Sequence, residues 1–239
     1  MEKINLTKLI AENSLYSRRQ AEKLIREGLV TIDKRIAKLG EKANNTTNIE
    51  IDGKKLISNN KKIYIKLNKP RDYVCTNRLF KGEKNIFSLI NIKERLFSLG
   101  RLDKDSCGLI ILTNDGDLTY KLTHPKFEHN KVYLVKLKND SRLKENEFIN
   151  RIIISFKKGL NIGEKTLAKA QSIKQIKENE FEIILSEGKK RQIREMFRVF
   201  GLEVDFLKRI NFAGIKLGNL KEGQWINLSK EEINILKED

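Results

Sequence analysis

Charged side chains gather in one short loop of this chain, between the glycines at positions 100 and 108. A carboxylate that lies beside a guanidinium stays ionised at neutral pH, because the positive charge favours the anion. An ionised aspartate can act as a nucleophile or as a base. An ion pair on an ordinary surface loop is the simpler interpretation, and the loop by itself favours it. The charged residues are Arg101, Asp103, Lys104 and Asp105.

An unbroken apolar run, Leu109–Leu112, follows the charged loop and leads into the turn residues 114–116. A short run of this kind is typical of a strand that is buried on both faces. Rigid elements are the best supports for reacting groups. The sequence therefore predicts a charged loop that is fastened to the start of a core strand.

A second charged cluster precedes a predicted helix that ends at Gly201. The apolar residues at positions 193, 196, 197 and 200 recur at helical spacing and define one face. Cations are unfavourable near a helix N-terminus, so an anion is expected beside them, and phosphate is the obvious candidate. The cations concerned are Lys189, Lys190, Arg191 and Arg194.

A clean alternating strand is predicted over residues 131–137, with Tyr133 on the same face as Lys131 and Val135. A half-buried aromatic residue is common on a strand and needs no function. The two histidines, His124 and His129, lie on a loop without cysteine or carboxylate partners at ligand spacing. We therefore expect no metal site, and we expect both histidines to face solvent or lie near phosphate.

The elements of the first 60 residues are predicted to form a small helical domain. Ser17–Gln20 is a capping-box pattern that opens a helix ending at Gly28. An earlier short helix has its apolar face at residues 6, 9 and 10, and strands are expected over 29–32 and 48–51. The second helix leaves its basic residues on the solvent side, and these are Arg18, Arg19, Lys23 and Arg26.

A polar linker over residues 58–62 is predicted to separate this domain, residues 1–60, from a second domain, residues 61–239. The second domain is expected to begin with a strand over 63–67, which Asn68-Lys-Pro70 ends because proline cannot donate a ladder hydrogen bond. Helices are predicted over 86–90, 117–123 and 142–150, and a strand pair over 167–176 and 181–186. Ser229 is expected to cap a last helix.

The formal net charge of +17 and the pI of about 9.7 point to a polyanionic partner. Residues 1–60 hold 12 basic and 8 acidic residues and so carry only +4 of this charge, which is spread over folded segments. No stretch reaches the roughly 20 apolar residues of a membrane span, and the N-terminus lacks the apolar core of a signal peptide. The two cysteines, Cys75 and Cys107, are far apart in sequence. We expect a cytoplasmic monomer without a membrane partner.

Four stretches resemble one known family. The stretch Gly100–Gly116, read as GRLDKDSCGLIILTNDG, resembles the signature of the pseudouridine synthases that modify ribosomal RNA. Asn68-Lys-Pro-Arg71 resembles the opening motif of that family, with Asp72 in place of the usual glycine. The strand around Tyr133 and the stretch Glu187–Arg194 resemble two further motifs, and residues 2–57 resemble the alpha-L RNA-binding motif.

The resemblance implies a role for each of five residues. Asp103 corresponds to the catalytic aspartate of the family, and Arg194 would pair with that carboxylate. Tyr133 would lie against the target base, Ile193 would pack beside it, and Arg101 would support the site. No cofactor and no metal are implied. The basic residues named above on the first domain and before residue 192 would contact RNA phosphates.

The fold implied is α+β, with the small helical RNA-binding domain followed by a mostly antiparallel β-sheet domain with flanking helices. The function implied is conversion of a specific uridine to pseudouridine in ribosomal RNA or in a ribosomal subunit precursor, with large-subunit RNA slightly favoured. A non-catalytic RNA-binding factor for ribosome assembly would explain the charge and the first domain. It would not explain Asp103, Tyr133 and Arg194 together. A DNA-binding protein is supported only by the basic helix of residues 18–26.

Overall fold

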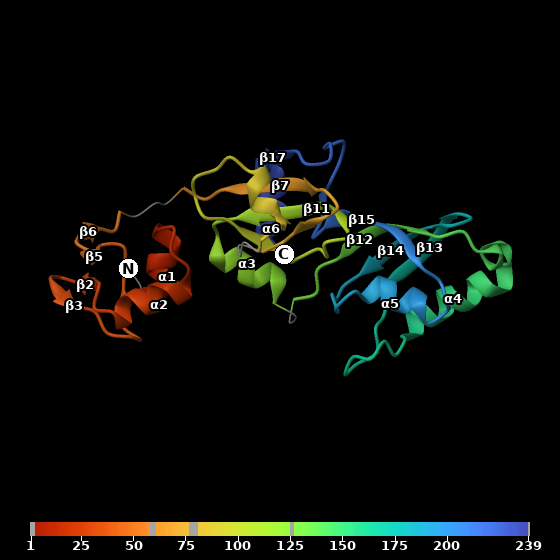
Figure 1. Ribbon diagram of the computed structural model, residues 1–239, viewed down its shortest axis with the longest axis horizontal. Helices are drawn as coiled ribbons and strands as arrows, with labels where there is room; N and C mark the ends of the chain where they lie inside the picture. The colour runs from red at the N-terminus through yellow and green to blue at the C-terminus, as the bar shows by residue number, and fades with distance from the viewer. Residues whose placement is uncertain (1–2, 58–60, 77–80, 125–126, 239) are drawn as a thin grey trace. The chain divides into compact units, whose positions relative to one another are not determined.

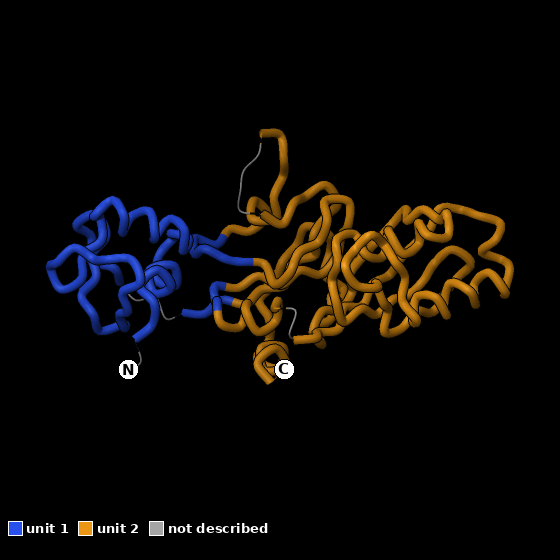
Figure 2. Tube along the Cα trace, turned by 90° about the horizontal axis from the view of Figure 1, so that it is seen from below, with its two compact units in different colours: residues 1–63, 92–97, 114–116 blue, residues 64–91, 98–113, 117–239 orange. Residues whose placement is uncertain are grey.

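The computed structural model describes residues 3–57, 61–76, 81–124 and 127–238, and its secondary structure is drawn in Figure 1. The chain forms two compact units, which Figure 2 colours separately. The first unit comprises residues 1–63 with the short segments 92–97 and 114–116, and the second comprises the rest. Residues 58–60 of the expected linker lie outside the described residues.

The first unit contains the two predicted helices, α1 (Leu6–Asn13) and α2 (Arg18–Arg26). The capping box of α2 is present, because the backbone N of Ser17 donates to Gln20 Oε1 at 2.8 Å and the backbone N of Gln20 donates to Ser17 Oγ at 3.2 Å. Ala21 and Ile25 bury one face of α2 in a small apolar core. All four predicted basic residues of this helix are exposed.

Six short strands accompany these helices in the first unit. A four-stranded sheet has the order β3-β2-β5-β6, and a separate pair joins β1 to β4. Val30, Ile32, Ile49 and Ile51 point into the same core as the helices. The strands are β1 (Ile4–Asn5), β2 (Val30–Ile32), β3 (Arg35–Ile36), β4 (Lys42–Ala43), β5 (Ile49–Ile51) and β6 (Lys54–Lys55).

The second unit is built on a nine-stranded sheet with the order β13-β14-β12-β15-β11-β7-β17, to which β10 and β16 add at β11 and β15. β11 and β15 run parallel, and the other pairs of this sheet whose register is described are antiparallel. The mostly antiparallel sheet is thus confirmed. Its strands are β7 (Tyr64–Lys69), β10 (Phe97–Leu99), β11 (Cys107–Thr113), β12 (Lys131–Leu137), β13 (Ser172–Lys177), β14 (Glu180–Leu185), β15 (Val204–Phe212), β16 (Ile215–Lys216) and β17 (Trp225–Asn227).

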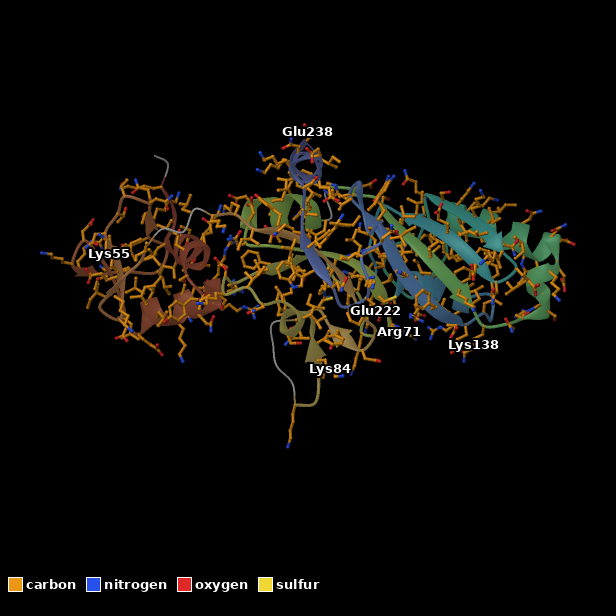
Figure 3. All side chains as sticks on the ribbon, turned by 90° about the horizontal axis from the view of Figure 1, so that it is seen from above. Lys55, Arg71, Lys84, Lys138, Glu222 and Glu238 are labelled. Carbon is orange, nitrogen blue, oxygen red and sulfur yellow. The ribbon has the colours of Figure 1, made fainter. Side chains whose placement is uncertain are left out.

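Helices pack on this sheet around two apolar cores (Figure 1). Helices α4 (Asn146–Lys158) and α5 (Gln192–Arg198) pack with β12, β13 and β14. Helices α3 (Gly116–Thr123) and α6 (Lys230–Glu238) pack with β11 and the end of β15. Two 3-10 helices, η1 (Ile86–Leu89) and η2 (Ser141–Lys144), and a short parallel pair of β8 (Tyr73–Val74) and β9 (Lys84–Asn85) complete the unit. Lysine side chains such as Lys84 and Lys138 stand out from its surface (Figure 3).

The helix predicted over 142–150 was wrong in its bounds. A 3-10 turn ends at Lys144, and α4 then runs on to Lys158, where Gly159 takes a φ of 105°. Phe148, Ile152 and Phe156 are buried at helical spacing, and this packing extends the helix through residues 151–158. The predicted strand over 167–176 begins later, at Ser172, because Ala168 pairs with Leu160 instead.

The strand predicted over 63–67 also continues further, to Lys69. Asn68 and Lys69 pair with Leu109 and Gly108 of β11, and the strand stops only at Pro70. Ser229 caps the last helix as predicted, since the backbone N of Glu232 donates to Ser229 Oγ at 3.2 Å. In the part of the chain that the structure describes, no helix is long and apolar enough to cross a membrane.

His129 does not face solvent, contrary to the first of the two expectations for the histidines. Its side chain is buried, and Nε2 lies 3.2 Å from the carbonyl oxygen of Lys121, so the end of α3 supplies its partner. His124 is half-buried and its ring packs on that of Tyr120, with ring centres 4.9 Å apart.

Candidate active site

The charged loop is anchored at its far end by a close approach of two strands. Gly108 and Arg209 are partners in the parallel pair of β11 and β15. A Cβ placed on Gly108 would lie 2.3 Å from the carbonyl oxygen of Arg209, and the φ of Gly108 is +103°. Only glycine tolerates both the contact and this backbone conformation. The loop is therefore held against β15 where the strand begins.

Buried Lys69 ties the same loop to the end of β7. Its side chain is fully buried, and Nζ donates to the carbonyl oxygens of Pro70 at 2.9 Å, Lys104 at 3.3 Å and Ser106 at 2.6 Å. Burial lowers the pKa of this ammonium, and nearby groups that include Asp105 and Asp103 act in the opposite direction. Three carbonyl acceptors satisfy its three N–H donors, which compensates for its removal from water.

Asp72, whose backbone lies in the left-handed region, connects the end of β7 to the charged loop. Asp72 has a φ of 66°, and its backbone N donates to the carbonyl oxygen of Lys104 at 2.8 Å. Aspartate is among the few residues other than glycine that adopt this conformation readily. Asp72 therefore takes the backbone conformation for which glycine is usually needed.

Asp103 is half-buried on the charged loop. Among the described residues it forms no ion pair and no side-chain hydrogen bond. Its backbone oxygen accepts from the backbone N of Ser106 at 3.1 Å, which closes the loop. Asp103 nevertheless lies in a basic environment. Its negative charge acts to raise the pKa values of Lys69, Arg191 and Arg194. Arg101 is exposed beside it.

Arg194 pairs with Asp105 and not with Asp103. Its Nε lies 3.2 Å from Asp105 Oδ2, its Nη2 donates to the backbone oxygen of Asp105 at 3.2 Å, and its Nη1 donates to Val204 O at 2.8 Å. The direct contact with Asp103 that the family resemblance implied is therefore not present in this structure. The guanidinium of Arg194 is instead engaged by the backbone oxygen and the carboxylate of Asp105.

Arg191 completes the group around Asp105 with two hydrogen bonds. Nη1 donates to Oδ1 at 3.2 Å and Nη2 to Oδ2 at 2.9 Å. Burial alone would raise the pKa of Asp105, but the bonds from Arg191 and the charges of Arg194 and Arg191 outweigh it and lower this pKa. Arg191 precedes the first residue of α5 and has a φ of 50°.

Two of the cations before α5 pair with carboxylates of the protein. Lys189 pairs with Glu187, and Arg191 pairs with Asp105. An external anion is therefore not required to balance these two residues, contrary to the argument from the sequence. Lys190 is exposed and forms no ion pair with the described residues. Buried Gln192 also donates to Glu187 Oε1, at 2.8 Å, and so orders this turn.

The apolar part of the site brings together three elements. Leu102 of the loop, Tyr133 of β12 and Ile193 of α5 belong to one buried cluster. Tyr133 is 8% exposed. Asp103 and Arg194 follow Leu102 and Ile193 directly in sequence. The structure thus brings the loop, β12 and α5 to one place, as the predicted site requires.

The sequence predicted no site role for four further residues, namely Lys69, Asp105, Lys131 and Arg209. Arg209 is 1% exposed, and Nε donates to the carbonyl oxygen of Leu109 at 2.8 Å. Lys131 Nζ donates to His129 O and Ser186 O, at 2.9 and 3.0 Å. Burial, followed by the charge of Arg209, lowers the pKa of Lys131 to about 8. For the three cations, the available signal was a basic residue within an apolar strand pattern.

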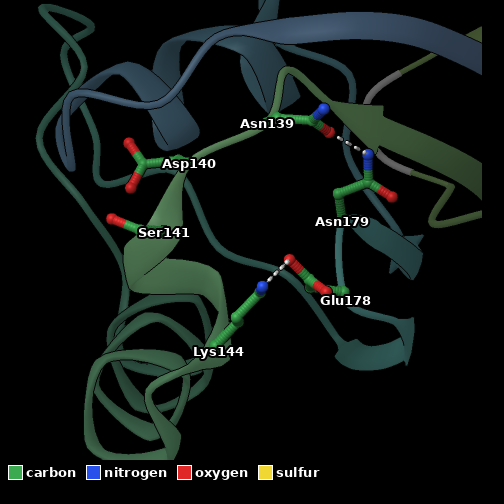
Figure 4. A pocket seen from close by; sticks show the side chains of 6 residues that line it. All are labelled: Asn139, Asp140, Ser141, Lys144, Glu178 and Asn179. Atoms are coloured by element: carbon green, nitrogen blue, oxygen red, sulfur yellow. Dashed lines mark hydrogen bonds and ion pairs between the residues drawn. The ribbon is translucent and has the colours of Figure 1, made fainter.

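A polar hollow elsewhere in the second unit contains none of the predicted site residues (Figure 4). Asn139 and Asn179 hydrogen bond across it, and Lys144 lies 3.7 Å from Glu178. Asp140 on its rim is held by Arg142, whose Nε and Nη2 donate at 2.9 and 2.7 Å. The described residues contain no group of three or more histidine, cysteine, aspartate or glutamate side chains that could hold a metal.

Family comparisons cover both parts of the chain. Residues 63–198 match the family described as RNA pseudouridylate synthase, and residues 6–44 match the S4 domain. A crystal structure of a pseudouridylate synthase is 31% identical in sequence, with a TM-score of 0.69, and the match covers 98% of this chain and 99% of that one.

Three relatives are similar along nearly the whole chain. An RNA pseudouridine synthase of Borreliella burgdorferi is 39% identical and covers 95% of this chain and 91% of the relative. Ribosomal large subunit pseudouridine synthase B of Bacillus subtilis is 35% identical, with 97% and 95% covered. Dual-specificity RNA pseudouridine synthase RluF of Escherichia coli is 34% identical, with 96% and 77% covered. With a family match over more than half of its length, the chain belongs to the RNA pseudouridylate synthases, and it carries an S4 domain at its N-terminal end.

Proposed function

We propose that this enzyme converts a specific uridine of ribosomal RNA to pseudouridine, with large-subunit RNA slightly favoured over small-subunit RNA as the substrate. The names of the Bacillus subtilis and Escherichia coli relatives support an RNA substrate of this class, and the first of these names supports the large subunit. The net charge of +17 fits a phosphate-rich partner.

Asp103 is the reacting group in this proposal. The single observation that carries it is that half-buried Asp103 pairs with no cation of the described residues, on a loop fixed by Lys69 and by the approach of Gly108 to β15. Such a carboxylate is positioned and accessible to a ribose. It would act either as a nucleophile or as a base on the sugar.

The reaction needs no cofactor because substrate and product are isomers. The bond from the ribose C1′ to N1 of the base breaks, the base turns, and C1′ is rejoined to C5. The hydrogen on C5 is lost and N1 gains one, so atoms and electrons balance. No oxidant, reductant or phosphate donor takes part.

The neighbouring side chains have supporting roles. Tyr133 stacks on the base and its hydroxyl assists proton transfer at the base carbon, while Ile193 packs beside the ring. Arg194 and Arg101 supply positive charge near Asp103. The target uridine must leave the RNA stack to reach this site, as for other enzymes that act on a base.

The two parts of the chain divide the work at about residue 60. Residues 1–60 place the RNA through phosphate contacts of Arg18, Arg19, Lys23 and Arg26, and residues 61–239 select the base and carry out the chemistry. The exposure of all four side chains on α2 supports the first role. Lys189, Lys190 and Arg191 are assigned to the RNA as well, with exposed Lys190 the most available of the three.

The test is to map pseudouridine in ribosomal RNA from cells with and without this protein, and in RNA treated with the pure enzyme.

Asp103→Asn should abolish the conversion and leave RNA affinity nearly intact, because a neutral side chain of the same shape replaces the carboxylate. Asp205→Asn, at an exposed position of β15, is the matched control. A near wild-type rate for Asp103→Asn, with Asp205→Asn active, would exclude Asp103 as the reacting group.

A further inference from the structure

Three aromatic side chains form a cluster on the surface of the second unit, at the end of α3 and in the turn that follows. The ring centre of Tyr120 lies 4.9 Å from that of His124 and 6.5 Å from that of Phe127, and the last two are 6.4 Å apart. These are the separations at which aromatic rings pack on one another. Tyr120 is 60% exposed, and the other two residues of this ring cluster are half-buried.

The apolar core does not require an aromatic residue at position 120. Helix α3 buries Leu118 and Leu122, which are four residues apart and so lie on one face. Tyr120 lies between them in sequence and is exposed to solvent. A single exposed apolar residue needs no explanation, but a contiguous group of them at the surface is a feature of binding sites.

The turn that carries the ring cluster is held by hydrogen bonds. The backbone N of His124 donates to the carbonyl oxygen of Tyr120, and that of Phe127 donates to the carbonyl oxygen of His124, both at 3.0 Å. The side chain of His129 is buried, and its Nε2 lies 3.2 Å from the carbonyl oxygen of Lys121, which fastens the end of the turn to α3. A surface that is ordered in advance loses little conformational entropy when it binds a ligand.

Lys131 joins this turn to the cationic turn, residues 187–191, which precedes α5. Its Nζ donates to the carbonyl oxygen of His129 at 2.9 Å and to that of Ser186 at 3.0 Å. Phe127 and His129 are two residues apart, so their Cα atoms are separated by at most about 7 Å. Ser186 directly precedes the cationic turn. The ring cluster and the cationic turn are thus linked through one lysine at the start of β12.

This combination of rings and cations fits single-stranded RNA. Proteins that hold single strands stack aromatic rings on the bases and attract the backbone with cations. Exposed Lys190 supplies such a cation in the cationic turn. Glu128 is exposed in the turn of the rings and would repel a phosphate there, so stacking must supply the attraction at the rings. A target uridine that leaves the stack also uncovers one face of a neighbouring base.

We propose that the ring cluster of Tyr120, His124 and Phe127 is a stacking surface for an unpaired base of the RNA substrate. Tyr120 contacts the base, and the other two rings hold its side chain in place. The inference rests on the proposed function, because it takes RNA as the partner. It adds to the phosphate contacts one contact that distinguishes unpaired from paired RNA, since a base inside a duplex has no free face.

The experiment measures the affinity of the full-length protein for two RNAs at one salt concentration. One is a short oligoadenylate, which has no uridine to react, and the other is an RNA duplex of the same length. Tyr120→Leu should weaken oligoadenylate binding by roughly 5- to 100-fold, the loss expected for one base–aromatic stack, and should leave duplex binding unchanged. Leucine is a good helix former, so α3 is kept. Tyr120→Phe keeps a ring and should bind both RNAs as wild type does.

Ile154→Ala is the matched control, because it removes an apolar side chain that is 52% exposed on α4 of the same unit. It should bind both RNAs as wild type does. A second measurement needs no variant: ultraviolet crosslinking of wild type to oligoadenylate, followed by mass spectrometry, should place the RNA on the peptide that contains Tyr120. The inference is overturned by an equal loss of duplex binding in Tyr120→Leu, by an equal loss in Tyr120→Phe, or by crosslinks that exclude this peptide.

Two results separate this inference from the proposed function. If wild type converts ribosomal uridine but Tyr120→Leu binds oligoadenylate normally, the ring cluster is not an RNA surface, and a protein partner becomes the explanation for its exposure. The proposed function stands in that case. If oligoadenylate binding depends on Tyr120 but wild type converts no uridine, the stacking surface stands and the proposed function fails.

Discussion

Single residues of the site differ in how far the sequence could predict them. The loop that carries Asp103 could be predicted because its charges, glycines and following strand are local features. The partner of Arg194 could not, because Asp103 and Asp105 are both carboxylates on one loop, and their separation in sequence does not decide between them. The choice depends on how α5 packs against the loop, and that packing involves contacts between residues about 89 positions apart.

The hydroxyl of Tyr133 is expected to assist proton transfer during the reaction. Tyr133→Phe keeps the ring in its buried cluster and removes only the oxygen. We expect turnover on ribosomal RNA to fall by roughly 100-fold or more, because general acid–base catalysis typically contributes about 100- to 10,000-fold. Steady-state conversion measures this. Tyr64→Phe, in β7 of the same sheet, controls for loss of a tyrosine hydroxyl. Unchanged turnover in both Tyr133→Phe and Tyr133→Ala would remove the residue from the site.

The half-buried amine of Lys131 is expected to make the stability of the protein depend on pH. Its pKa is about 8 in the folded protein and ordinarily 10.5, so between these values the unfolded chain binds a proton that the folded chain has released. Stability contributed by this residue therefore rises with pH across the window from about 8 to 10.5, and the cost of burying the charge is fully present below it.

The measurement is the free energy of unfolding of wild type minus that of Lys131→Met, at pH 7 and at pH 10. The difference should shift in favour of wild type at the higher pH, since methionine has no charge to bury. Lys136→Met, at an exposed position of the same strand, corrects for the general effect of removing a lysine. A difference that is independent of pH would contradict the lowered pKa of Lys131.

At the scale of elements, local patterns predicted some boundaries well and others poorly. The capping box at Ser17 and the cap at Ser229 fixed two helix starts, because the signal lies within four residues. Helix α4 was predicted too short, because the isoleucines at 152–154 are as typical of a strand as of a helix. Burial of Phe156 against α5 decides in favour of the helix, and this contact is not local.

The parallel contact of β11 with β15 makes Gly108 indispensable to the sheet. Gly108→Ala should lower the free energy of unfolding by at least roughly 3 kcal/mol, because the new Cβ overlaps a backbone oxygen and the φ of +103° is strained for alanine. Urea denaturation measures this loss.

Gly218→Ala separates the steric overlap from the backbone strain. Gly218 also has a positive φ, of +62°, but no atom lies within 4 Å of its would-be Cβ. We expect this variant to lose only roughly 1–2 kcal/mol, the ordinary cost of a left-handed residue. If both variants lost the same free energy of unfolding, the overlap at Gly108 would have no cost of its own. β15 would then be able to move away from β11 freely.

For the molecule as a whole, the charge of +17 predicted the class of partner but not the surface that binds it. Arg18, Arg19, Lys23 and Arg26 are all exposed, as a helical pattern could predict, although Lys23 lies 3.6 Å from Glu27. Lys189 and Arg191, in contrast, are less exposed than Lys23 and pair closely with Glu187 and Asp105. A count of cations in the sequence cannot distinguish these cases. The carboxylates that engage Lys189 and Arg191 are brought there by the fold.

The basic helix α2 is expected to contact RNA phosphates. Neutralising Arg18, Arg19 and Lys23 together should weaken RNA binding and flatten its salt dependence, because each lost phosphate contact removes roughly one unit from the log–log salt slope. The single-turnover rate on saturating enzyme should change little, since the proposed reacting group, Asp103, lies outside the first 60 residues. Neutralising Lys34, Lys54 and Lys55, three exposed lysines of the same unit, removes an equal charge and is the matched control.

The two triple variants distinguish a specific surface from general attraction. If α2 contacts the phosphates, the helix variant loses more affinity and more of the salt slope than the control variant does. Equal losses in both variants would show that only the net charge of the unit matters. A large drop in the saturated rate of the helix variant, with binding and salt slope unchanged, would place α2 within the catalytic machinery and contradict the proposed division of labour between residues 1–60 and 61–239.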